Sequence, residues 1–231
     1  AGFWFMPGLR GKRIRQDGMR HSKSSMLKRA MTILTVLTLI PVCGFTVRNE
    51  QCKCCDVPIL MYHSVTKVNC NDYVLSPAAF RADLQYLTDK GYHTVFVRDV
   101  IRFADGKGTL PEKPIVLTFD DGFYNNYATV LPLLEEFDAV ATFCIVGSYS
   151  EKERGETKRS MVYSYMAPAE IAAAVRTGRV ELANHTYDMH CIKNGRKGVR
   201  KRPSESVEAY AELFSSDVKK NENLLSAANV K

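Results

Sequence analysis

The sequence lacks an excess of charge over most of its length. Its formal net charge is +7, and the first thirty residues account for all of it, with eight lysines and arginines beside one acid, Asp17. Beyond residue 30 the basic and acidic side chains are equal in number. A surface that binds nucleic acid needs a basic patch or stripe within the folded domain. The balance therefore excludes that class of protein, and we predict no nucleic-acid partner.

Long hydrophobic runs are also missing. The apolar stretch at residues 30–42 follows Lys28 and Arg29 and is shorter than the roughly 20 residues of a membrane span. A positive start followed by an apolar stretch of about 7–15 residues is typical of a secretory signal. We predict a signal peptide or membrane anchor at residues 26–44, after a disordered upstream segment at residues 1–25. The protein should then act outside the cytoplasm, secreted or attached to a membrane by this segment.

The seven cysteines lack the spacing of a structural zinc site. The stretch CKCC at residues 52–55 has no second ligand pair at a suitable distance. A disulfide within residues 52–70 remains an alternative to unpaired cysteines in an exported chain. We interpret residues 45–56 as a Cys-rich linker and Cys144, inside an apolar run, as core packing.

From residue 57 onward the sequence alternates strand-like and helix-like segments. No repeat or low-complexity tract interrupts this pattern, which predicts parallel β/α units and one domain at residues 57–231. Ser76 before Pro77 marks a helix start, Gly91 a helix end, and Pro132 a kink. The charged stretch at residues 148–166 is expected to be a solvated loop. Strands are predicted at residues 57–65, 93–97, 113–119, 139–147 and 180–185, and helices after Ser76 and at residues 98–105, 123–137, 167–178 and 204–228.

Polar side chains stand at the carboxyl ends of three predicted strands, where β/α barrels collect their chemistry. His63 ends the first strand, Asp120 and Asp121 end the third, and His185 ends the last. Two histidines, His185 and His190, with one carboxylate form a donor set of catalytic metal sites. The other carboxylate could then act as a general base.

Two motifs resemble those of a known family. TFDDG at residues 118–122, with HTYDMH at residues 185–190, resembles the polysaccharide deacetylases, the NodB-homology carbohydrate esterases. PILMYHSV at residues 58–65 resembles the opening strand of one branch of that family. The resemblance covers roughly residues 56–231 and implies a distorted (β/α)7-type barrel. It also implies a metal-dependent hydrolase that removes acetyl groups from N-acetylglucosamine-containing cell-wall or extracellular polysaccharide.

The resemblance further implies roles for single residues. Asp120 corresponds to the catalytic base, and Asp121, His185 and His190 correspond to the ligands of a divalent metal. Zn²⁺ is the first expectation, with Co²⁺, Ni²⁺ and Mn²⁺ as alternatives. His63 could contact the polysaccharide substrate, and a purely structural role at the barrel mouth stays open.

The sequence departs from the family in two respects. His185 and His190 are five residues apart instead of the usual four, so on a regular helix their rings would not share a face. We predict a loop or a widened turn there; the alternative is that His190 is a surface residue. After His190 the sequence lacks the family's Arg/Pro, groove-aromatic and histidine-acid motifs.

We therefore expect an incomplete barrel whose C-terminal strands are missing, with feeble activity. The alternative function is a non-catalytic glycan-binding remnant or an inactive fragment of such a deacetylase. The final predicted helix carries an apolar stripe that should pack on a sheet, formed by Tyr210, Leu213, Phe214 and Leu224.

Overall fold

The computed structural model describes residues 2–4, 56–68, 71–193 and 195–228. The predicted signal or anchor segment, nearly all of the linker, and five of the seven cysteines lie outside the described residues. Residues 2–4 lie inside the segment expected to be disordered, yet they form the short strand β1 (Gly2–Trp4), antiparallel to β2. An open sheet edge offers unpaired backbone groups to such a strand. In the part of the chain that the structure describes, no helix is long and apolar enough to cross a membrane.

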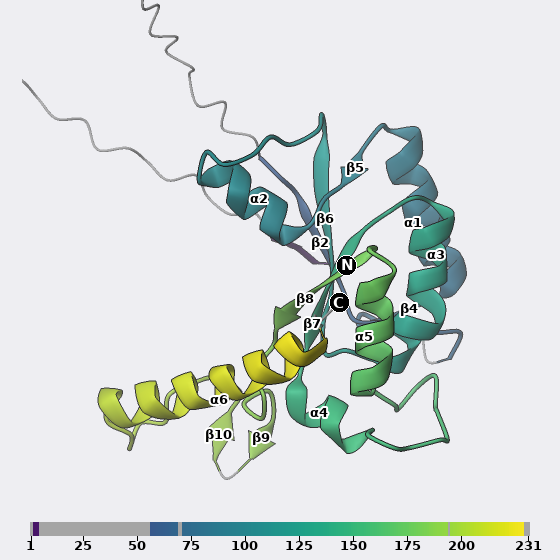
Figure 1. The fold of residues 1–231 in the computed structure, drawn as a ribbon. Coiled ribbons are helices and arrows are strands. Elements are labelled where there is room, and N and C mark those ends of the chain that lie inside the picture. The colour runs from purple at the N-terminus through teal and green to yellow at the C-terminus, as the bar shows by residue number, and fades with distance from the viewer. Residues whose placement is uncertain (1, 5–55, 69–70, 194, 229–231) are drawn as a thin grey trace, which may run out of the picture. The chain divides into compact units, whose positions relative to one another are not determined.

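A six-stranded sheet forms the centre of the fold, in the order β1-β2-β6-β7-β8, with β5 beside the start of β6 (Figure 1). Apart from β1, every strand pair in this sheet is parallel, as the alternation of strands and helices predicts. Its parallel strands are β2 (Ile59–Tyr62), β5 (His93–Thr94), β6 (Pro114–Phe119), β7 (Ala141–Ile145) and β8 (Val180–Asn184).

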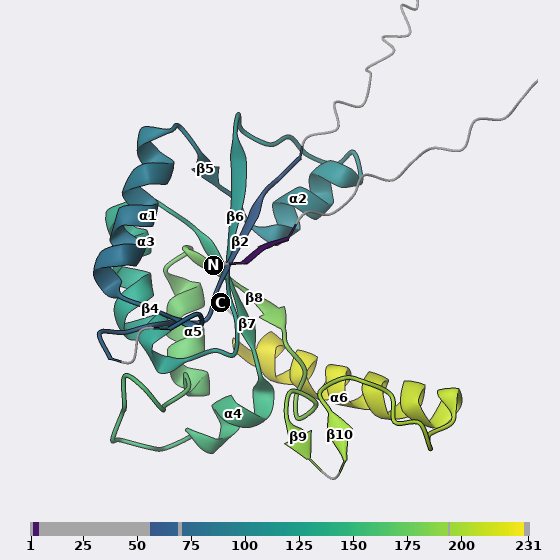
Figure 2. The same ribbon diagram turned by 180° about the vertical axis from the view of Figure 1, so that it is seen from behind.

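Helices cover both faces of this sheet. Figures 1 and 2 show α1, α3 and α5 on one side and α2 on the other. The helices are α1 (Pro77–Asp89), α2 (Val97–Ala104), α3 (Leu131–Glu136), α4 (Gly147–Lys152), α5 (Pro168–Arg176) and α6 (Val207–Ala228). Two small pairs complete the elements: β3 (Ser64–Val65) with β4 (Val74–Leu75), and β9 (Ile192–Lys193) with β10 (Arg196–Lys197). The protein is thus α/β, and its described strands form an incomplete barrel.

An aromatic cluster ties the ends of the central strands to α1. Phe119 at the end of β6 lies edge-to-face with Phe80 at 5.4 Å and with Phe143 at 5.5 Å between ring centroids. The ring of Tyr62 stacks on Phe119 at 5.2 Å. Edge-to-face and offset-stacked rings pack favourably beyond the area that they bury. Because Asp120 follows Phe119 directly, this cluster fixes the point from which the two aspartates leave the sheet.

Local sequence signals explain several helix ends. The hydroxyl oxygen of Ser76 accepts a hydrogen bond from the Ala79 backbone N–H at 3.1 Å, as a helix N-cap should. Pro132 is accommodated by a π-helical segment, η1 (Asn126–Val130), just before α3. There the Leu131 N–H donates to the carbonyl of Asn126, five residues back. The predicted irregularity at Pro132 therefore takes the form of a widened turn.

Two predictions are wrong in detail. The stretch at residues 148–166 is a solvated loop only in part, because it begins within α4 and the side chain of Arg159 is only 11% exposed, whereas residues 154–158 are exposed as predicted. The apolar stripe of α6 does not pack along its whole length, since Leu213 is 44% exposed. Only the end of α6 nearest the sheet is buried, through Asn221, Leu225 and Ala228 (Figure 1).

Candidate metal centre

Two aspartates follow β6 in different backbone conformations. The N–H of Asp120 donates to the Tyr62 carbonyl at 2.9 Å and so continues the pairing of β6 with β2. Asp121 has a φ of 70°, in the left-handed region, and Gly122 follows with a φ of 74°. A non-glycine residue in this region is strained, and such residues cluster at functional sites. The backbone thus changes direction between Asp120 and Asp121, so that two adjacent carboxylates are accommodated at one strand end.

Three residues from two distant parts of the sequence meet at this edge of the sheet. Oδ1 of Asp121 lies 3.6 Å from Nε2 of His185 and 3.2 Å from Nε2 of His190. One ligand atom from each residue lies within 4.8 Å of the others. Residues 185–190 form bends and turns and no helix, so the prediction of a loop is confirmed. The five-residue spacing is therefore compatible with both rings facing one point.

The donor set fits a divalent metal ion. Oδ1 of Asp121 is buried and accepts no hydrogen bond, and an unpaired buried carboxylate oxygen is costly. Burial lowers the pKa of His185, and the charges of Asp120 and Asp121 oppose that shift. Burial thus favours the neutral imidazole, which is the form that binds metal. Two imidazoles and one carboxylate suit zinc and similar first-row metals.

Asp120 lies next to this cluster without belonging to it. Its charge acts on His185 from one side and on Cys144 of β7 from another. Burial first, and the Asp120 carboxylate second, raise the pKa of the Cys144 thiol well above its usual value. Cys144 is a free, partly buried thiol between the buried Phe143 and Ile145, but it lies outside the main apolar cluster, so the prediction of core packing is only partly confirmed. The structure thus places a further carboxylate beside the three-residue cluster.

His63 is not one of the three clustered residues, although its charge contributes, after burial and the charge of His190, to the lowered pKa of His185. It follows β2, and its ring meets that of Tyr73 edge-on at 5.3 Å between centroids. It also lines a cavity of about 420 Å³ together with Tyr73, Asp72 and Asp83.

Sequence reasoning missed an aromatic wall beside His190. The ring of Tyr149, on α4, lies 6.1 Å from the imidazole of His190 and 4.5 Å from the ring of Tyr165. Tyr165 in turn stacks on Phe123 at 5.1 Å. Burial, then the charges of Tyr149 and Asp121, raise the pKa of Tyr165 to about 12. Its phenol therefore keeps its proton near neutral pH. The tyrosines at residues 149 and 165 were the available signal in the sequence. They were overlooked because the many charges of residues 148–166 indicated a solvated loop.

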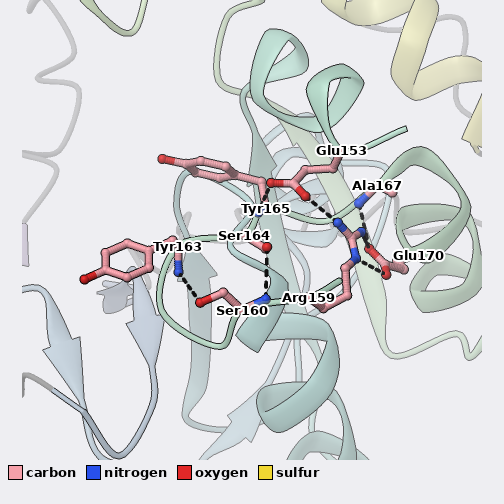
Figure 3. A network of polar contacts seen from close by, with 8 residues as sticks. All are labelled: Glu153, Arg159, Ser160, Tyr163, Ser164, Tyr165, Ala167 and Glu170. Atoms are coloured by element: carbon pink, nitrogen blue, oxygen red, sulfur yellow. Dashed lines mark hydrogen bonds and ion pairs between the residues drawn. The ribbon is translucent and has the colours of Figure 1, made fainter. Parts of the chain in front are cut away.

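A buried arginine fixes this wall (Figure 3). Arg159 pairs with Glu153 on one side and with Glu170 of α5 on the other. Glu153 also accepts the Tyr165 N–H at 3.1 Å, and Glu170 accepts the Ala167 N–H at 2.7 Å. Figure 3 shows the three charged side chains converging between the segment that carries Tyr165 and the start of α5. Charge-assisted, forked hydrogen bonds of this kind give rigid geometry.

Comparison with known proteins decides the family. Residues 107–228 match the family model described as Polysaccharide deacetylase, which is more than half of the chain. The chain belongs to the polysaccharide deacetylase family. The match contains Asp121, His185 and His190 as well as Asp120.

The chain matches parts of two longer curated relatives. It is 32% identical over 118 residues to the poly-β-1,6-N-acetyl-D-glucosamine N-deacetylase of Escherichia coli K12, a stretch that covers 49% of this chain and 18% of that protein. It is 23% identical over 154 residues to the protein of the same name from Staphylococcus epidermidis, covering 67% of this chain and 49% of that one. The chain thus spans at most about half of either relative.

The fold has solved counterparts. A de-N-acetylase from Aggregatibacter actinomycetemcomitans superposes with a TM-score of 0.60 at 23% identity, covering 74% of each chain. This likeness supports the (β/α) barrel architecture of the polysaccharide deacetylase described above.

Proposed function

We propose that the protein is a metal-dependent hydrolase that removes acetyl groups from N-acetylglucosamine-containing polysaccharide. The proposal depends chiefly on one observation: Asp121, His185 and His190 converge within 4.8 Å beside a further carboxylate, Asp120. The names of the two curated relatives, both N-deacetylases of a poly-N-acetylglucosamine, support this substrate class.

The three clustered residues would hold the metal, with Zn²⁺ first and Co²⁺, Ni²⁺ or Mn²⁺ as alternatives. A divalent ion bound there would supply a Lewis acid that polarises the acetyl carbonyl and makes water more acidic. Asp120 would take the proton of the attacking water as the general base. The amide C–N bond would then break as the proton taken up by Asp120 passes to the leaving nitrogen, which releases acetate and leaves a free amine on the sugar.

Side chains around the centre would orient the sugar. Tyr149 and Tyr165 form one wall, and the raised pKa values of both keep them uncharged hydrogen-bond donors near neutral pH. His63 and the cavity that it lines with Tyr73 would contact the polymer on the other side of the strand ends. The apolar stretch at residues 30–42 supports an extracytoplasmic place of action.

The experiment is an acetate-release assay on poly-β-1,6-N-acetylglucosamine oligomers, with zinc and with a chelator. We expect zinc-dependent release that Asp120→Asn reduces by about 10²–10⁴-fold, the usual effect of a general base. The matched control is Asp105→Asn, which removes an exposed carboxylate that pairs with Lys107 at the end of α2. Oligomer binding without any release would instead favour the non-catalytic glycan-binding function.

A further inference from the structure

We infer that Asp217 and Asn221, on helix α6, are positioning residues that fix the metal-ligand loop at residues 184–190. This inference rests on the proposed metal centre, because positioning matters only if His185 and His190 bind an ion. Neither α6 residue belongs to the cluster or to any motif that the sequence singled out. Asp217 binds backbone N–H groups between the two histidines, and Asn221 binds the side chain of Asn184 just before His185.

Asp217 binds the loop with both of its carboxylate oxygens. Oδ1 accepts the N–H of Tyr187 at 2.7 Å, and Oδ2 accepts the N–H of Asp188 at 2.8 Å. These two N–H groups are consecutive and lie between His185 and His190 in the sequence. Hydrogen bonds to a charged acceptor are about twice as strong as neutral ones. The carboxylate therefore fixes the middle of the loop to α6.

Asn221 fixes the start of the loop. Its side chain is fully buried, and its Nδ2 donates to the carbonyl of Ile145 at 2.8 Å and to Oδ1 of Asn184 at 2.9 Å. Oδ1 of Asn184 also accepts the Thr186 N–H at 3.0 Å, and Nδ2 of Asn184 donates to the carbonyl of Val218. A chain of amides thus joins the ends of β7 and β8 to α6 on either side of His185.

The loop needs such support, because its own conformation is strained. Thr186 has a φ of 68°, a region that β-branched residues avoid. Backbone bonds from α4 add to the restraint, since Gly147 N–H donates to the Thr186 carbonyl and Ser148 N–H to the Tyr187 carbonyl. A Cβ at Gly147 would lie only 2.4 Å from Oδ1 of Asn221, so α4 and α6 are too closely packed here for any side chain at position 147. Strained residues persist where surrounding contacts over-determine them.

The five-residue spacing explains why this support affects the metal. A helix with four-residue spacing places two histidines on one face by itself. A loop does not, so the distance between the rings of His185 and His190 depends on bonds from outside the loop. Residues that orient metal ligands in this way typically change metal affinity about 10–100-fold when they are removed.

The test compares Asp217→Ala and Asp217→Asn with Glu222→Gln. Glu222 is an exposed acid on the same helix and takes no part in these bonds. Zinc affinity is measured by competition with a chromophoric chelator, and amide hydrogen exchange is followed in the zinc-free protein. Asp217→Ala should weaken zinc binding about 10–100-fold and speed exchange at Tyr187 and Asp188. Asp217→Asn keeps the shape and one acceptor, so it should fall between Asp217→Ala and the wild type, while Glu222→Gln changes neither quantity.

The outcomes separate this inference from the proposed function. Zinc affinity that stays within twofold of wild type in Asp217→Ala, with faster exchange at the two amides, would overturn the inference and leave the metal centre standing. A wild-type chain that binds no zinc would overturn the proposed metal centre and the inference with it. If Asp217→Ala is too unstable to measure, Asp217→Asn decides: unchanged affinity overturns the inference, and intermediate affinity supports it.

Discussion

Nε2 of His190 lies 3.2 Å from Oδ1 of Asp121, although 69 positions separate the two residues in the sequence. The carboxylate reaches this point because β6 ends in a left-handed turn, and the imidazole reaches it because the loop after β8 is not helical. Neither feature alone brings the two together. The candidate centre is therefore a property of two strand ends and of the elements that fix them.

Substitutions of the two adjacent aspartates should affect different properties, zinc affinity in one case and activity in the other. Asp121→Asn replaces a charged ligand by a neutral one and should weaken zinc binding strongly. Asp120→Asn should keep the zinc and lose the base, and with it about 10²–10⁴-fold of activity. Zinc titration and acetate release measured on the same samples check both. Equal loss of zinc affinity in the two variants would contradict the division of roles.

His190→Ala should reduce zinc affinity and leave the fold intact, because the ring is partly exposed and packs mainly on His185 and Tyr149. The matched control is His93→Ala, an exposed histidine whose Nδ1 lies 3.0 Å from the Glu112 carbonyl. Calorimetric zinc titration and thermal unfolding are the measurements. If His190→Ala and His93→Ala bind zinc equally well, then His190 is not a zinc ligand.

Arg159→Met should lower the free energy of unfolding by about 1.5–3 kcal/mol, because Glu153 and Glu170 lose a charged, largely buried partner. The aromatic wall should loosen at the same time, since Glu153 also accepts the Tyr165 N–H. Arg81→Met is the control: its pair with Glu136 is half-exposed, and such pairs are worth about 0–1 kcal/mol. Urea unfolding measures both. Similar losses in the two variants would contradict a special role for Arg159.

Acid should destabilise the zinc-free protein partly through His185. Burial lowers the pKa of this imidazole below its ordinary value of 6.5. As the pH falls through about 6.5, His185 binds a proton in the unfolded chain but not yet in the folded chain. The free energy of unfolding therefore decreases. Urea unfolding with a chelator at about pH 7.5 and about pH 5.5 measures this decrease. His185→Gln should show a smaller decrease, and a decrease as large as that of the wild type would contradict the assignment.

Local signals made part of this structure predictable. Ser76 and Pro77 identify the start of α1, and the polar residues after the apolar strands identify Asp121 and His185, because these depend only on neighbours in the sequence. The family resemblance added the barrel and the separate roles of Asp120, Asp121, His185 and His190. The prediction of a loop at residues 185–190 combined the expectation that both histidines bind one metal with the geometry of a regular helix.

Other features depend on contacts between distant residues and left no such signal. Arg159 is charged, so its stretch reads as solvated, yet two glutamates seventeen positions apart make its burial favourable. Asp217 lies thirty positions after Tyr187, and nothing in the pattern of α6 shows that its carboxylate caps a loop. The exposure of Leu213 on α6 has a similar explanation. Hydrophobic periodicity shows which face of a helix is apolar, but it does not show what packs on that face.

Zinc K-edge X-ray absorption on the protein with one equivalent of zinc tests the central claim most directly. It is best measured with Cys52, Cys54 and Cys55 replaced by serine, so that the linker cannot compete for the ion. The account predicts imidazole nitrogen and carboxylate oxygen neighbours at roughly 2.0–2.2 Å, with two histidines and no sulfur. A sulfur neighbour at about 2.3 Å, or a spectrum unchanged in His185→Ala, would contradict the proposed centre.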